Sequence, residues 1–372
     1  MIQRFTFGCP LPTESVVLPV EPAAAAVPYL TAVPYLTAEP DGSWSFSLAE
    51  DAVVYGLGEM PRGINKRGWH YVADNTDESH HGENRLSYYG AHNFLLIDGG
   101  AGRSVFGVFV DFPGKVFYDI GYTRHDRLTF RTEEPDYDLY ILTGDSPNAV
   151  CTEFRKLIGH SYIPPKWAFG FAQSRWGYKT AEDVRAIARQ YRENELPLDM
   201  ICLDIDYMQR YADFTVNKER FPDLAALSAE LKQQGIRLVP IIDAGVRMDP
   251  EDPTCTEGLE KGYFCTKADG TPFVAAVWPG KAYFADFLRP EVRDWFGHRY
   301  KVLTDCGIEG FWNDMNEPAL FYSPERLRAF LDSMAQLREK DNLEQEEFFA
   351  KVVGGAMGLM NSPADYASFY HD

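Results

Sequence analysis

Three aspartates in the second half of this sequence each stand where a short apolar run ends: Asp204, Asp243 and Asp314. Where the strands of a sheet are parallel, their carboxyl ends meet at one edge and project side chains into a common mouth. Neighbouring unpaired carboxylates are costly, so three of them together favour general acid, general base or nucleophilic chemistry. Any one of them alone could instead cap a helix or pair with a cation.

Two further carboxylates accompany this set. Asp206 is two residues from Asp204, and alternate residues of a strand point to the same side, so we expect both to project into the mouth. Such a pair could also hold a divalent metal in a nucleotide-sugar transferase, but no glycine-rich phosphate loop accompanies it, and no metal is predicted. Glu317 follows Asp314 closely and is predicted to be structural, since adjacent loop residues seldom face one substrate bond from opposite sides.

Three tryptophans lie near the same predicted strand ends or in a long connection between them: Trp176, Trp278 and Trp312. A single tryptophan is most simply explained as core packing. Three at one mouth suggest flat faces that stack on sugar rings.

The elements that must position these residues fall into two domains. Residues 1–165 are short β-type runs broken by Gly, Pro, Asn and Asp, which predicts an antiparallel β-sandwich. The clearest predicted strands are 44–48, 94–97, 104–110 and 137–142. From 166 to 372, short apolar runs alternate with helical patterns, which is typical of α/β structure with a parallel sheet.

Four β/α units can be placed in the second domain, which is the first half of a (β/α)8 TIM barrel. The predicted strands are 168–173, 200–205, 238–242 and 308–312, and the predicted helices are 181–194, 224–234 and 291–305. The connection 243–289 is far longer than usual, which predicts an active-site loop, with an ordinary insertion as the alternative. Four strands alone would leave two open edges, so we expect self-association or a complementing C-terminal half.

Composition limits the kinds of binding partner and the cellular compartment that we expect. The formal net charge of −19 disfavours binding to nucleic acid or to an anionic membrane, and leaves neutral small molecules as the easier ligands. Six scattered cysteines, no apolar leader and no membrane-length apolar stretch predict a cytoplasmic protein. The pair His80-His81 has no second cluster at ligand spacing, so we expect a solvated loop there.

The order of motifs along the chain resembles glycoside hydrolase family 31, the retaining α-glucosidases and α-xylosidases, and is most similar to bacterial α-glucosidases. The motifs are Tyr55-Gly-Leu-Gly-Glu59, Gly63-Ile-Asn-Lys-Arg67, Gln173-Ser-Arg-Trp-Gly-Tyr178, Asp204-Ile-Asp-Tyr-Met208, Val277-Trp-Pro-Gly280 and Gly310-Phe-Trp-Asn-Asp-Met-Asn-Glu-Pro318.

The resemblance implies roles for individual residues. Asp314 would be the catalytic nucleophile, and Asp204 would bind sugar hydroxyls in the −1 subsite. The residues implied to line that subsite are Ile205, Ile241, Trp278, Trp312 and Met315, with Trp176 in its wall. Asp77 matches the acidic tip of a loop from the first domain and is an expected +1 contact.

The implied activity is an α-glucosidase that removes terminal glucose from short α-gluco-oligosaccharides by two-step retaining hydrolysis, without a cofactor. Retention needs a second acid about 5–5.5 Å from the nucleophile. In the family that acid follows the region where this sequence ends, so the acid/base is not expected in this chain, which resembles an N-terminal portion. The alternatives are a non-catalytic sugar-binding remnant, a half-enzyme and, within the family, an α-xylosidase.

Overall fold

The computed structural model describes residues 1–23, 36–77, 80–100, 102–316, 318–338, 340 and 342–368. They form two compact units, Met1–Tyr162 and Ile163–Asp372. The boundary expected at residue 165 lies just inside the second unit.

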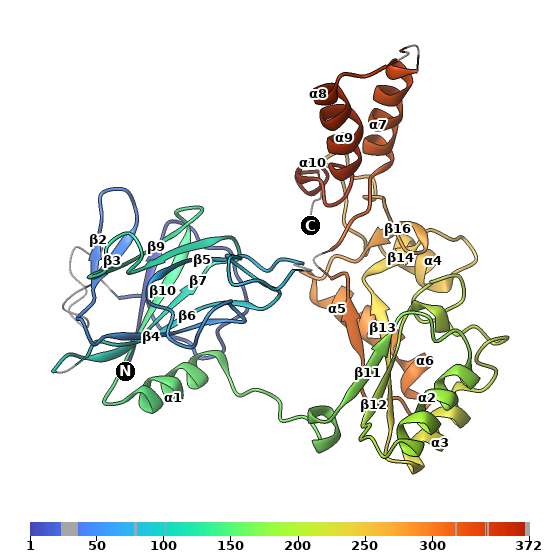
Figure 1. Ribbon diagram of the computed structural model, residues 1–372, viewed down its shortest axis with the longest axis horizontal. Helices are drawn as coiled ribbons and strands as arrows, with labels where there is room; N and C mark the ends of the chain where they lie inside the picture. The colour runs from blue at the N-terminus through green and yellow to red at the C-terminus, as the bar shows by residue number, and fades with distance from the viewer. Residues whose placement is uncertain are drawn as a thin grey trace. The chain divides into compact units, whose positions relative to one another are not determined.

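The first unit is a sandwich of two five-stranded antiparallel sheets, as the sequence predicts (Figure 1). One sheet has the order β1-β10-β7-β6-β4 and the other the order β2-β3-β9-β8-β5. The strands of the first sheet are β1 (Ile2–Phe7), β4 (Val53–Gly58), β6 (Ala91–Asp98), β7 (Val105–Asp111) and β10 (Tyr137–Gly144). Those of the second sheet are β2 (Leu36–Ala38), β3 (Trp44–Ser47), β5 (Trp69–Ala73), β8 (Val116–Ile120) and β9 (Arg127–Thr132).

Alternation of buried and less buried side chains explains the sandwich. On β8 the residues Val116, Tyr118 and Ile120 are buried, and the two between them are less so. Phe46 and Phe106 meet edge to face across the two sheets, with ring centroids 4.9 Å apart. The opposite face of the first sheet is covered by the helix α1 (Pro147–Ile158), whose buried residues pack against β6, β7 and β10.

One buried hydrogen bond in the sandwich core yields a stability prediction. Trp44 Nε1 donates to the Tyr137 hydroxyl at 2.7 Å, and both residues are buried. Tyr137→Phe leaves the indole N–H buried without an acceptor, so we expect the free energy of unfolding to fall by about 1–3 kcal/mol. The exposed Tyr122→Phe is the control in urea unfolding, and equal losses for the two variants would contradict this explanation.

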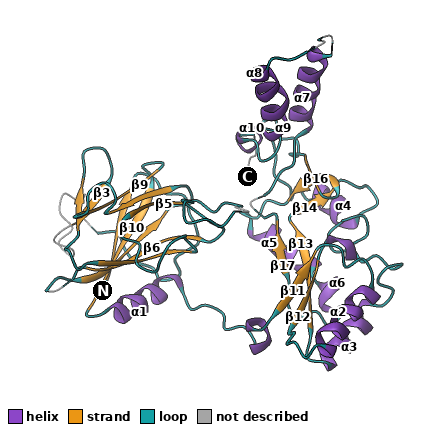
Figure 2. Ribbon diagram, in the orientation of Figure 1, coloured by secondary structure: helices purple, strands orange, loops and turns teal. Residues whose placement is uncertain are grey.

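The second unit is built on a four-stranded parallel sheet in the order β11-β12-β13-β17. Its strands are β11 (Ala172–Arg175), β12 (Met200–Leu203), β13 (Arg237–Asp243) and β17 (Trp312–Asp314). The helices that connect them are α2 (Ala181–Glu193), α3 (Leu224–Gln233), α5 (Pro290–Arg299) and α6 (Lys301–Thr304). Their apolar faces share one core cluster with the strands, as expected of successive β/α units (Figure 2).

Three predicted boundaries in this unit are wrong. Residues 166–169 form a 3-10 helix that begins after Pro165 and ends at Gly170, so the first strand starts only at Ala172. The strand predicted at 308–312 is observed as the shorter and later strand β17, because only Trp312, Asn313 and Asp314 pair with β13. The helix predicted at 291–305 is interrupted at Tyr300.

The long connection after β13 folds as a small antiparallel sheet, β14-β16-β15, together with one helix. These elements are β14 (Gly245–Arg247), α4 (Pro253–Glu260), β15 (Ala275–Val277) and β16 (Gly280–Phe284). After β17 the chain forms the helices α7 (Pro324–Leu337), α8 (Gln345–Glu347), α9 (Gly354–Met357) and α10 (Pro363–Tyr366), with a π-helical segment Phe348–Val353 between α8 and α9.

The C-terminal helices are tied to the inserted sheet through backbone and side-chain contacts. The Ala276 N–H donates to the Tyr322 carbonyl at 2.8 Å. Ser323 caps α7 and donates its hydroxyl to the buried Asp365 at 2.7 Å.

In the described part of the chain no helix has the length and apolarity that a membrane span requires. None of the six cysteines forms a disulfide.

Candidate active site

The carboxyl ends of the central strands bring three aspartates together. Asp243 and Asp314 are the last residues of β13 and β17 and are direct register partners. Asp204 immediately follows β12, and its side chain accepts a hydrogen bond from the Ile205 N–H at 2.7 Å. The carboxylates of Asp204 and Asp314 each repel that of Asp243. The convergence expected from the strand ends is therefore observed.

Burial raises the pKa of two of these carboxyl groups. Asp243 is 2% exposed, and desolvation, followed by repulsion from Asp314 and then Asp204, raises its pKa to about 7. Desolvation also raises the pKa of Asp204, against the opposing hydrogen bond from the Ile205 N–H, and repulsion from Asp314 adds to the rise. The site thus holds one carboxyl group, that of Asp243, that changes protonation near neutral pH.

The structure adds a fourth acidic residue that sequence reasoning missed. Asp213 is buried, and its Oδ1 accepts a hydrogen bond from the Asp243 N–H at 3.0 Å. Desolvation, with repulsion from Asp243, raises the pKa of Asp213 well above its ordinary value. Nothing in the local sequence marks Asp213, because it follows no predicted strand and reaches Asp243 only through the fold.

Tyrosines also support the strand ends. The buried Tyr207 hydroxyl donates to the Ile241 carbonyl at 2.8 Å, which links the turn after β12 to β13. The Tyr300 hydroxyl donates to Asn313 Oδ1 at 2.6 Å, which holds the residue before Asp314. These contacts fix the backbone positions from which Asp204 and Asp314 project.

Asp206 does not behave as expected. The strand ends at Leu203, and residues Ile205–Tyr207 form a 3-10 turn, so the alternation of a strand does not extend to Asp206. Its side chain is buried and lies 3.7 Å from an Arg220 nitrogen. Asp206 is therefore an ion-pair partner behind the site, and the prediction that it shares the projection of Asp204 is wrong.

Two of the three predicted tryptophans meet. Trp278 and Pro279 form the two-residue turn between β15 and β16, which places Trp278 at a hairpin tip of the inserted sheet. Its ring lies 6.1 Å from that of Trp176 between centroids, and it meets Phe321 edge to face at 5.0 Å. Trp278 is 45% exposed and Trp176 is 62% exposed, so the pair presents aromatic faces to solvent. Trp312 instead is partly buried and packs against the core cluster of the second unit.

The apolar residues implied for the pocket differ in accessibility. Ile205 and Ile241 are each buried in the core cluster of the second unit. Met315 follows Asp314 with a φ of 55°, a left-handed conformation that is strained for this side chain, and packs against the inserted sheet. The strained position directly after Asp314 indicates that the surrounding structure fixes the chain at this point.

The remaining candidates lie elsewhere. Asp77, in the connection from β5 to β6 of the first unit, accepts a hydrogen bond from the Tyr89 hydroxyl at 2.6 Å. Glu317 lies outside the described residues. The His81 ring contacts Tyr88, with centroids 5.0 Å apart. Over the described ranges, no three His, Cys, Asp or Glu side chains gather as metal ligands.

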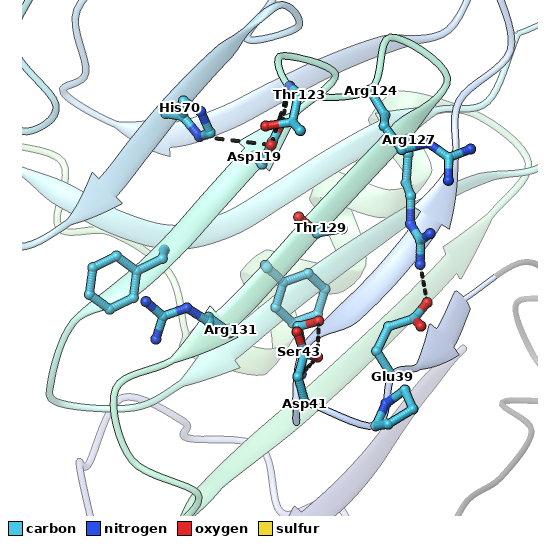
Figure 3. A pocket seen from close by; sticks show the side chains of 13 residues that line it. Glu39, Asp41, Ser43, His70, Asp119, Thr123, Arg124, Arg127, Thr129 and Arg131 are labelled. Atoms are coloured by element: carbon cyan, nitrogen blue, oxygen red, sulfur yellow. Dashed lines mark hydrogen bonds and ion pairs between the residues drawn. The ribbon is translucent and has the colours of Figure 1, made fainter.

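A groove of about 730 Å³ crosses the outer face of the second sandwich sheet (Figure 3). Arg127 pairs with Glu39 in this groove, and a His70 ring nitrogen lies 3.9 Å from Asp119. None of the described side chains that line this groove stands out as a catalytic group. The strand-end site of the second unit is therefore the better candidate for catalysis.

Comparison with protein families gives two matches that follow the two units. Residues 161–351 match the description "Glycosyl hydrolases family 31 TIM-barrel domain". Residues 32–119 match "Glycosyl hydrolase 31 N-terminal galactose mutarotase-like domain".

Individual relatives agree with these matches. The chain is 42% identical to Alpha-glucosidase 2 of Bacillus thermoamyloliquefaciens over 74% of its own length and 35% of the relative. It is 33% identical to Alpha-xylosidase 1 of Arabidopsis thaliana over 75% of its length and 31% of the relative. The chain thus spans about a third of the length of these relatives.

Solved structures show the same fold. A Flavobacterium johnsoniae GH31 dextranase complexed with isomaltotriose is 25% identical, with a TM-score of 0.66, over 76% of this chain and 34% of that chain. A chain of the ER glucosidase II heterodimeric complex, which consists of the catalytic subunit and the binding domain of the regulatory subunit, is 25% identical, with a TM-score of 0.66, over 75% of this chain and 33% of that chain.

Proposed function

Because the chain belongs to glycoside hydrolase family 31, we propose that it carries the nucleophile side of a retaining α-glucosidase site. The observation that carries this proposal is the placement of Asp314 at the end of β17, in register with Asp243 and beside Asp204. A carboxylate in this position can attack a sugar carbon that neighbouring groups hold in place.

In the proposed reaction a carboxylate oxygen of Asp314 attacks the anomeric carbon while the bond to the leaving oxygen breaks. The leaving oxygen takes its proton from a second acid, for which none of the described carboxylates is assigned. Water then hydrolyses the glycosyl ester, and the anomeric configuration is retained after two inversions. Carboxylates suffice for these steps, and no cofactor is required by them.

The other residues are assigned by their place around Asp314. Asp204 is proposed to accept hydrogen bonds from sugar hydroxyls, since its carboxylate lies beside the nucleophile. The pair Trp176 and Trp278 is proposed to stack on a sugar ring, because both faces are accessible. Ile205, Ile241, Trp312 and Met315 are proposed to shape the floor and wall of the −1 subsite, and Asp77 remains a proposed +1 contact.

The open edges of the sheet favour a structural partner. β11 and β17 are the edge strands of the described sheet, and most of β11 is exposed. We propose that further strands complete a barrel there, from a complementing segment or from a second copy. We also propose a reducing, cytoplasmic location, which the lack of disulfides among the six cysteines supports.

The proposed function is tested on the protein purified from its native source. Incubation with maltose and with isomaltose is expected to release glucose, and proton NMR is expected to show the α anomer first. Release of the β anomer first would contradict the retaining mechanism.

Two other outcomes would point to different functions. Faster release of xylose from an α-xyloside would favour the α-xylosidase alternative, which the similarity to a plant α-xylosidase supports. Binding of maltose without turnover would favour the sugar-binding alternative.

A further inference from the structure

A pocket of about 380 Å³ in the second unit is lined in part by Trp278. Three arginines line it, Arg210, Arg220 and Arg247, together with the polar side chains of Gln209 and Asn217. No carboxylate belongs to its lining in the described structure. In a chain with a formal net charge of −19, a pocket lined by three guanidinium groups is a local reversal of sign.

Neighbouring carboxylates neutralise the charge of the three guanidinium groups only in part. Asp249 Oδ2 accepts a hydrogen bond from Arg210 at 2.8 Å and lies 3.5 Å from Arg247 Nε, so one carboxylate serves two arginines. Arg220 lies 3.7 Å from the buried Asp206. The side chains of Arg210 and Arg220 remain about half exposed, which leaves N–H groups directed to solvent.

Arg247 is held by the backbone around the pocket and by one ion pair. Its Nη1 donates to the carbonyls of Arg210 at 3.1 Å and Pro279 at 3.3 Å. Its Nε is buried and makes no hydrogen bond to any described residue. The Nε charge is balanced by Asp249 at 3.5 Å, so the terminal nitrogens are the groups that Arg247 can offer to an anion in the pocket.

The loop that presents Arg210 is held in a strained conformation. Arg210 has a φ of 53° and Tyr211 a φ of 59°, both in the left-handed region that side chains of this size rarely adopt. The loop is fixed on both sides, since the Gln209 N–H donates to Thr215 Oγ1 at 2.9 Å and Phe214 is buried. Such strain persists only where the surrounding structure fixes the backbone, and strained residues are frequent at binding sites.

We propose that this pocket binds an oxyanion, a phosphate or carboxylate group, carried by a saccharide that stacks on Trp278. Guanidinium groups present paired N–H donors that match the oxygens of these anions. A neutral sugar carries no charge for three cations to balance. The saccharide part of this inference rests on the proposed function, but binding of the oxyanion does not depend on turnover.

Isothermal titration calorimetry at low ionic strength tests the proposal with three probes: glucose 6-phosphate, inorganic phosphate and glucose. Saturable binding of glucose 6-phosphate that exceeds binding of glucose is expected. Equal affinity for inorganic phosphate would identify a free anion as the occupant, whereas tighter binding of the sugar phosphate would identify a charged saccharide. Both results support an oxyanion site, and neither requires glucosidase activity.

Variants locate the binding. Arg247→Gln and Arg210→Gln are each expected to weaken binding of glucose 6-phosphate by about tenfold or more. Arg220→Lys keeps a cation opposite Asp206, and it is expected to weaken binding through loss of the guanidinium fork. The matched control is Arg328→Gln on α7, whose side chain is 71% exposed, and unchanged affinity is expected.

The competing explanation is that the arginines only brace the loop. In that case neither phosphate probe binds saturably, or the affinity is the same in the wild type and in the arginine variants. Either result overturns the proposal. Circular dichroism and the thermal midpoint of each variant show that it is folded, so loss of binding cannot be assigned to unfolding.

Discussion

Replacement of Asp314 by alanine is expected to abolish turnover of α-glucosides by the protein from its native source. The loss in kcat should be on the order of 10⁴-fold or more, because the covalent intermediate cannot form without the nucleophile. Binding of maltose, measured by calorimetry, is expected to change little, since Asp204 and the Trp176–Trp278 pair are untouched. The kinetic assay is glucose release from maltose at saturating substrate.

A matched control uses another aspartate of the same unit. Asp305 is exposed and pairs with Lys301 at the end of α6, so Asp305→Asn should leave kcat unchanged. If Asp314→Ala retained wild-type turnover, the nucleophile would have to be another group. If neither the wild type nor the variant turned over substrate while both bound sugar, the sugar-binding alternative would replace the enzyme.

The stability of the 372-residue chain is expected to fall as the pH rises from about 4 to about 7, through Asp243. The folded-state pKa of this carboxyl is about 7, against 3.8 for the unperturbed group, so the folded chain holds a proton that the unfolded chain releases over this range. The stabilisation is complete below the unfolded-state pKa and is lost as pH rises through the folded-state pKa. The total effect is about 4 kcal/mol, from about 1.4 kcal/mol per pH unit.

The comparison of wild type with Asp243→Asn measures the titration of Asp243 together with its repulsion of the neighbouring carboxylates. Asparagine resembles the protonated carboxyl, so the two free energies of unfolding should be similar at pH 4, and the variant should be the more stable at pH 7.5. Urea unfolding at intervals between these values measures the difference. Burial also raises the pKa of Asp213 in both proteins, and Asp243→Asn removes the part of that rise that comes from repulsion by Asp243.

Asp305→Asn provides the control, because its carboxylate is exposed to solvent. Its free energy of unfolding should run parallel to that of the wild type. Parallel curves for Asp243→Asn as well would show that Asp243 is ionised throughout, and that another group neutralises it.

The strand ends were predictable because burial of a parallel strand requires a continuous apolar run, and such a run is visible in the sequence. That information placed Asp204, Asp243 and Asp314 at one edge of the sheet, and the register of β13 and β17 bears this out for the last two. The same reasoning failed for Asp206, since a period of two holds only while the strand continues, and the strand ends at Leu203.

Other parts of the site leave no local signal. Asp213 supports Asp243 from a loop, and Arg210 and Arg247 share Asp249 although they come from different segments. Trp176 and Trp278 are far apart in the chain and meet because a hairpin tip of the inserted sheet lies near the end of β11. Each of these contacts depends on how loops are packed, which no hydrophobic period records.

By itself, the sequence determined the two-domain order, the parallel strands, the acidic strand ends and the membership of the family, because apolar periodicity and motif order are properties of the chain. Only the tertiary structure decided which acids are buried, which is paired and where cations gather. Those properties depend on the distance between groups remote in sequence, since both desolvation and charge interaction are set by what surrounds a side chain in space.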